Sequence, residues 1–108
     1  MLLRKDGVNG QRFFSAEAVQ NMQTNQIASI GASAALGWEL DRPHFMGKLR
    51  TRETFGKTGF TGTSCVVDRA KGVACVILSN QTYPKRPVDR SSIDVFRCAI
   101  ADAVFSAP

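Results

Sequence analysis

One triplet, Lys57-Thr58-Gly59, has residue types and spacing that could do chemistry. It lies in a glycine- and threonine-rich run, Phe55 to Thr63, and two strand-like segments follow it. Two interpretations remain open. The triplet either lines a binding site on a strand edge, or consists of a solvated lysine, a β-branched strand residue and a turn glycine. Gly62 is a turn glycine in the second interpretation.

No catalytic nucleophile or general base accompanies the triplet. No serine in the sequence has a lysine three positions later. The single histidine, His44, has no carboxylate or serine placed to partner it, so we expect a surface residue rather than a base. We therefore predict no catalytic residue within these 108 residues.

Three cysteines, Cys65, Cys75 and Cys98, could form a disulfide, bind a metal or supply a reactive thiol. No ligand spacing accompanies them and His44 is distant in sequence, which disfavours a metal. A catalytic thiol would need a base partner. We expect free cysteines that are buried as small apolar side chains, with no metal and no cofactor.

Size and composition are typical of one soluble domain. The chain has 108 residues, of which 44% are hydrophobic, and no apolar run approaches the length of a membrane span. Its net charge is +5, but the basic residues are scattered and no nucleic-acid-binding motif accompanies them. We expect no nucleic-acid or membrane partner. Residues 1–7 do not resemble a secretory signal, which predicts a cytoplasmic location for the chain as written.

The first half contains few regular elements. Ser15 is placed to cap a helix over residues 16–22, and residues 23–35 read as a loop. Residues 36–40 predict a strand that Pro43 follows closely. Residues 44–53 suggest either a hairpin arm or an exposed connection.

The second half predicts three antiparallel strands. They span residues 54–59, 63–68 and 73–80, and the last is apolar enough to be buried on both faces. A turn at residues 69–72 would pair Asp68 with Val73 and Val66 with Cys75. In that register Cys65 and Cys75 point to opposite faces, so we predict that they are not bonded to each other.

A final helix is predicted to about Phe105, capped by Ser91 or Ser92. Its expected apolar face contains residues at helical spacing: Ile93, Phe96, Ile100 and Val104. Its opposite side would carry Arg97, Ala101 and Asp102. The sequence thus predicts an α+β fold: a small antiparallel sheet of three or more strands with a packed C-terminal helix, in a single partial domain over residues 1–108.

The sequence resembles the C-terminal part of the β-lactamase-like serine hydrolases, which include class C β-lactamases, D-alanyl-D-alanine peptidases and related esterases. Lys-Thr-Gly on a strand is one of their shared motifs. The similar stretches run in order along the chain: Leu2-Leu3 with Gly7 and Gly10, Phe14 to Val19, Gly37 to Leu40, Phe55 to Ser64, Asp68, Leu78 to Asn80, and the final helix.

The resemblance implies a partial α/β domain. Family members are several times longer, are often exported, and place the active site between this domain and a helical one. Their Ser-x-x-Lys nucleophile and Tyr-x-Asn triplet are not found here, since Tyr83 precedes Pro84 and Lys85. We therefore expect a truncated hydrolase that is inactive alone.

Site roles follow from the same resemblance. Lys57 and Thr58 would bind the substrate carboxylate, Gly59 would let the substrate approach, and the Phe60 N–H would be one of two oxyanion donors. Two alternatives to an inactive fragment remain: a module that binds a small acyl or β-lactam ligand, and an interaction protein that self-associates or complements a second chain. Loss of the N-terminal strands would expose the edge of the last strand, which predicts a homo-oligomer.

Overall fold

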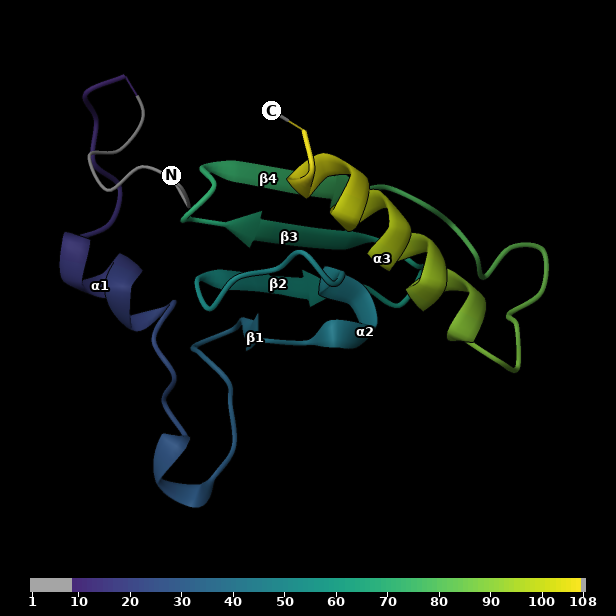
Figure 1. The fold of residues 1–108 in the computed structure, drawn as a ribbon, viewed down its shortest axis with the longest axis horizontal. Helices are drawn as coiled ribbons and strands as arrows, with labels where there is room; N and C mark the ends of the chain where they lie inside the picture. Colours follow the sequence, from purple (N-terminus) through teal and green to yellow (C-terminus); the bar gives the residue numbers. More distant parts are fainter. Residues whose placement is uncertain (1–8, 108) are drawn as a thin grey trace.

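The computed structural model describes residues 9–107. Its strands form one antiparallel sheet in the order β1-β2-β3-β4, and α2 and α3 lie beside it (Figure 1). This arrangement confirms the predicted α+β fold. The elements are α1 (Ala16–Asn21), the 3₁₀ helix η1 (Ala28–Ile30), β1 (Glu39–Leu40), α2 (Pro43–Met46), β2 (Thr54–Thr58), β3 (Ser64–Asp68), β4 (Val73–Ile77) and α3 (Ser91–Phe105).

The short helix α1 confirms the prediction made from its cap. The Ser15 hydroxyl accepts the Ala18 N–H at 3.0 Å, which satisfies one of the free donors of the first turn. The predicted loop after it contains the single turn η1. Leu2, Leu3 and Gly7, which contributed to the resemblance, lie outside the described residues.

The three consecutive strands have the predicted register. Asp68 pairs with Val73 and Val66 with Cys75, so Cys65 and Cys75 stand on opposite faces of the sheet. All three cysteines are free. Of the three, Cys75 is buried, whereas Cys65 and Cys98 are only partly covered.

The segment predicted as a hairpin arm or an exposed connection begins instead with a helix. Residues 44–46 belong to α2, and Phe45 and Met46 are fully buried. Residues 48–53 form no helix or strand, are mostly exposed and connect α2 to β2, as the second alternative predicted. Phe45 can lie on the sheet because Gly56 has no side chain: a Cβ there would stand 3.1 Å from the Phe45 ring and 2.7 Å from the Cys65 carbonyl oxygen. The core cluster consists of Phe45, Met46, Val66, Ala101 and Phe105.

The buried face of α3 differs from the predicted one. Its fully or nearly buried residues follow a spacing of four, namely Ile93, Arg97, Ala101 and Phe105. Phe96 is 48% exposed, whereas Arg97, expected on the solvent side, is 1% exposed. The apolar pattern misled because two of the three groups that accept hydrogen bonds from Arg97 are backbone carbonyls far away in sequence, and only Asp94 lies nearby on the same helix.

The start of α3 also differs. Neither Ser91 nor Ser92 is the N-cap, which is Arg90 without a side-chain hydrogen bond. The capping interaction comes from outside the helix, since the Asp89 carboxylate accepts the Ser91 N–H at 2.9 Å. Hydrogen bonds from the Ser91 hydroxyl and N–H lower the pKa of Asp89.

Strand β4 is not buried on both faces, although its apolar sequence predicted this. Cys75 faces the helices and is buried, but Ala74 and Val76 on the opposite face are exposed. Within residues 9–107, the only strand paired with β4 is β3. The described part of the chain therefore leaves apolar surface at this edge of the sheet.

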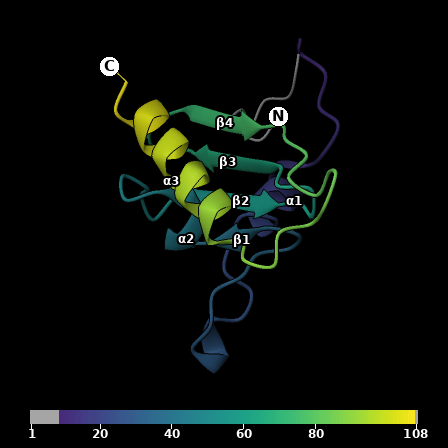
Figure 2. The ribbon, with the colours of Figure 1, turned by 90° about the vertical axis from the view of Figure 1, so that its right-hand side faces the viewer.

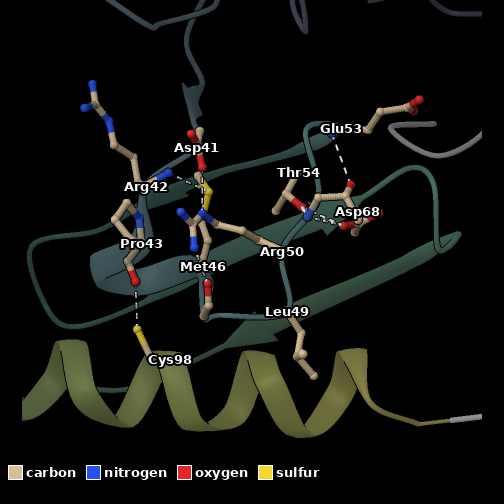
Figure 3. Close-up of polar contacts among 12 residues, drawn as sticks. Asp41, Arg42, Pro43, Met46, Leu49, Arg50, Glu53, Thr54, Asp68 and Cys98 are labelled. Carbon is tan, nitrogen blue, oxygen red and sulfur yellow. Dashed lines mark hydrogen bonds and ion pairs between the residues drawn. The ribbon is translucent and has the colours of Figure 1, made fainter.

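A buried carboxylate ties β2 to the end of β3 (Figure 3). Asp68 accepts the Thr54 hydroxyl at 2.6 Å, the Thr51 N–H at 3.1 Å and the Lys71 N–H at 3.0 Å. Burial alone would raise the pKa of Asp68, but these hydrogen bonds together outweigh it and hold the pKa below its ordinary value.

Both ribbon views show α3 running obliquely to the strands (Figures 1 and 2). Two hydrogen bonds join α2 and the segment after it to α3: the Cys98 thiol donates to the carbonyl of Pro43 in α2 at 3.2 Å, and Asp102 accepts the N–H of Leu49, which follows α2, at 2.8 Å. None of the helices described between residues 9 and 107 is long and apolar enough to cross a membrane.

Candidate functional site

Three of the four predicted site residues surround one hollow of the sheet. Lys57, Thr58 and Gly59 line it at the end of β2, and its volume is about 310 Å³. Phe60, the fourth, follows directly but is not part of this lining. The other lining residues come from β3, β4 and their flanks: Thr63, Ser64, Cys65, Val76, Ile77 and Leu78.

The ammonium group of Lys57 is held by a carboxylate from the neighbouring strand. Its Nζ lies 3.1 Å from Oε1 of Glu39, and the Lys57 side chain is 56% exposed. Nε of Arg42 lies 3.6 Å from the other oxygen of the same carboxylate. Glu39 was missed as a site residue by the sequence interpretation, since the pairing of β1 with β2 could not be read from local sequence.

The segment Gly59–Thr63, which we call the 59–63 loop, is a tight turn closed by two backbone bonds. The Gly59 N–H donates to the Thr63 carbonyl at 2.8 Å, and the Gly62 N–H donates to the Gly59 carbonyl at 3.1 Å. Gly59 has no room for a side chain, because a Cβ would stand 2.1 Å from Oγ1 of Thr63. Gly62 has φ +97°, a conformation that favours glycine.

Phe60 stands at the outside of the 59–63 loop. Its ring is 61% exposed, and the guanidinium carbon of Arg86 lies 4.6 Å from the ring centroid. Among the hydrogen bonds of residues 9–107, none uses the Phe60 N–H. This backbone donor is therefore available to a ligand. Arg86 was not predicted as a neighbour, because it lies in a loop distant in sequence.

The outer backbone edge of β2 is only partly covered. Strand β1 pairs with Phe55 and Gly56 and no further. Within the described residues, the edge from Lys57 to Gly59 has no strand partner on that side. An extended ligand can pair with such an edge through its own backbone groups.

Of the remaining candidate residues, Cys65 lines this hollow, whereas Cys75, Cys98 and His44 do not. Burial raises the pKa of Cys65 and of Cys75, which keeps both as weakly nucleophilic thiols at neutral pH. His44 is exposed, as predicted, and packs edge-on against Phe45 at a ring separation of 5.1 Å. In the part of the chain that the structure describes, no three metal-binding side chains cluster.

The chain is similar to known proteins over most of its length. The family model described as Beta-lactamase matches residues 2–96. Two Escherichia coli proteins named "Putative D-alanyl-D-alanine carboxypeptidase", from O157:H7 and from strain K12, are 36% and 34% identical over 92 residues. These matches cover 81% of this chain and 20% of each relative, so the chain spans about a fifth of their length.

A solved structure has the same fold. A crystal structure of a β-lactamase from Mycobacterium bovis superposes with a TM-score of 0.71 at 26% identity, over 97% of this chain and 39% of the other. The match of a family model over most of the sequence, together with the shared fold, shows that this chain belongs to the β-lactamase family.

Proposed function

We propose that this chain forms the substrate-binding wall of a serine hydrolase site and binds the carboxylate of an acyl-D-alanine or β-lactam-like ligand. One observation carries the proposal: Lys57, Thr58 and Gly59 line a single hollow, and no strand among residues 9–107 pairs with the β1 side of these same residues. The names of the E. coli relatives support a peptide ending in D-alanyl-D-alanine as the ligand class.

Each residue has a role in this proposal. The Lys57 ammonium attracts the carboxylate, and Glu39 restricts where that ammonium can lie. The Thr58 hydroxyl donates a hydrogen bond to the same group, and Gly59 leaves space for the ligand backbone. The free N–H of Phe60 supplies one oxyanion donor.

The sequence offers no Ser-x-x-Lys nucleophile for hydrolysis, because none of its serines has a lysine three positions later. Loss of the nucleophile costs several orders of magnitude in rate in serine hydrolases. We therefore propose that the chain binds without turnover unless a Ser-x-x-Lys segment is supplied by further sequence or by a second chain. A fragment with no retained function is the competing hypothesis.

Isothermal titration with benzylpenicillin tests the binding proposal. We expect saturable binding by the chain, at least tenfold weakening in Lys57→Ala and Thr58→Val, and no change in Lys48→Ala, which removes an exposed positive charge elsewhere. A chromogenic cephalosporin should not be hydrolysed. Absence of binding, or equal binding by Lys57→Ala, would contradict the proposal, as would covalent acylation of a serine.

We also propose that the chain associates through the exposed edge of β4. Val76 is 61% exposed and Leu78 is 83% exposed, and β3 is the only strand paired with β4 among residues 9–107. An apolar strand edge pairs readily with another strand. Its occupant is a second copy of this chain; a complementing chain that carries Ser-x-x-Lys is the alternative.

A further inference from the structure

Arg97 is a charged side chain that the proposed binding site does not explain. It lies in the middle of α3, and it is 1% exposed. Its Nη1 donates to Oδ1 of Asp94 at 2.8 Å, one turn earlier in the helix. Its Nη2 reaches across to the sheet, to the carbonyl oxygens of Thr63 at 3.0 Å and Gly59 at 3.4 Å.

These two carbonyls are the ones that close the 59–63 loop. The Thr63 carbonyl already accepts the Gly59 N–H, and the Gly59 carbonyl already accepts the Gly62 N–H. A single guanidinium group therefore donates to both ends of the turn. Hydrogen bonds from a charged donor are roughly twice as strong as neutral ones.

The bond to the Gly59 carbonyl has a consequence for Phe60. The Gly59 carbonyl and the Phe60 N–H belong to one planar peptide unit, in which a trans bond directs the two groups in opposite directions. Because Arg97 holds the carbonyl on the α3 side, the N–H must point away from α3. A hydrogen bond to the carbonyl also polarises the peptide and strengthens its N–H as a donor.

A purely structural reason for Arg97 is insufficient. Burying an ion pair costs desolvation energy, and an apolar side chain of similar volume often gives equal or greater stability. An apolar side chain could fill the space between α3 and the 59–63 loop. It could not, however, donate to the two carbonyls and so could not set the direction of the Gly59–Phe60 peptide.

We propose that Arg97 is a positioning residue for the oxyanion donor: it fixes the peptide plane whose N–H, that of Phe60, faces the ligand. This inference rests on the proposed function of the site. Arg97 itself touches no ligand, and it acts only through the 59–63 loop.

The test combines a loop signal with ligand binding in the full 108-residue chain. The ¹⁵N–¹H shift of the Phe60 amide reports the direction of its peptide, the exchange rates of the Gly59 and Gly62 amides report the closure of the loop, and titration with benzylpenicillin reports the site. The variants are Arg97→Met and Arg97→Lys. Asp102→Asn is the matched control, because it weakens another α3 contact, with the Leu49 N–H, away from the loop.

We expect all three variants to lower the melting temperature. Only the Arg97 variants should shift the Phe60 amide signal, raise the exchange rates of the hydrogen-bonded Gly59 and Gly62 amides, about tenfold or more in Arg97→Met, and weaken penicillin binding. Arg97→Lys should recover part of each effect, because an ammonium can donate to one carbonyl. A Phe60 amide that is unchanged in Arg97→Lys, or equally changed in Asp102→Asn, would overturn the inference.

The two proposals can fail separately. If Arg97→Met does not fold, the Arg97→Lys and Asp94→Asn variants still test the inference. Asp94→Asn keeps the positive charge of Arg97 but removes the carboxylate that is paired with it. If the unmodified chain does not bind penicillin, the proposed function fails and with it the ligand role of Arg97. If the chain binds and the Arg97 variants bind equally well, only the positioning inference fails.

Discussion

Asp68 shows how one side chain can make stability depend on pH. Its carboxylate is fully buried and accepts three hydrogen bonds, and its pKa lies below the ordinary value. A depressed pKa contributes stability that is fully present above the unfolded-state pKa of about 3.9. That contribution is lost as the pH falls through the lower folded-state pKa.

We therefore predict that Asp68→Asn lowers the free energy of unfolding by about 1.5–3 kcal/mol at pH 7, because an amide satisfies the three donors poorly. The acid limb should also change: between pH 5 and about 2 the variant should lose less stability than the unmodified chain. Urea unfolding at a series of pH values measures both effects. If the free energy of unfolding fell equally with pH in the two proteins, Asp68 would not be the group that causes the acid sensitivity.

A second prediction concerns the space around Gly59. Its backbone needs no special conformation, but a Cβ would overlap Oγ1 of Thr63. Gly59→Ala should cost about 1–3 kcal/mol of unfolding free energy through this overlap. Adding Thr63→Ala removes the obstructing hydroxyl, so the double variant should be more stable than the sum of the single effects predicts. Simple additivity in thermal or urea unfolding would refute the steric explanation.

At the scale of elements, the strands were predictable and the helix contacts were not. The register of β3 and β4 follows from a local turn and from alternation, both visible in consecutive residues. The position of α2 depends on Gly56, which permits Phe45 to approach the sheet. That contact joins segments whose neighbourhood no local pattern encodes.

The same distinction applies to the candidate site. Lys57-Thr58-Gly59 could be found by its motif, because its members are adjacent in sequence. Glu39 and Arg97 could not, since each becomes a neighbour only after another strand or helix docks. The helical spacing of apolar residues also placed Arg97 on the solvent side, whereas the two carbonyl oxygens that accept hydrogen bonds from its Nη2 are brought to it only by the folded 59–63 loop.

The orientation of α3 predicts different stability costs for two phenylalanines on the same helix. Phe105 is 4% exposed in the core cluster, while Phe96, predicted to be buried, is 48% exposed. Phe105→Ala should therefore cost about 3–5 kcal/mol in unfolding free energy. Phe96→Ala should cost less than about 1 kcal/mol, since little of its contact area lies in the core. Denaturant unfolding of the two variants compares them, and the reverse order would mean that the helix packs by its other face.

At the scale of the whole molecule, the described residues form a sheet with α2 and α3 over one face and an exposed apolar edge at β4 (Figure 1). The Mycobacterium bovis β-lactamase structure is matched over 39% of its chain, so most of that chain lies outside the match. A protein with an exposed edge strand such as β4 avoids aggregation when that strand is covered by another element, carries charged side chains or pairs with another strand. None of its five residues, Val73 to Ile77, is charged.

The exposed edge of β4 predicts that copies of this chain associate with one another. Light scattering at about 10 µM should show a dimer or larger oligomer, and Val76→Lys should shift it to monomer, because a lysine on an edge strand opposes pairing. Val88→Lys adds the same charge at a fully exposed loop position and should leave the oligomer intact. The net charge of +5 opposes association only weakly at physiological salt, where screening acts within about 8 Å. Strand pairing should therefore prevail over repulsion, and a monomeric unmodified chain at this concentration would show that another segment already protects the edge of β4.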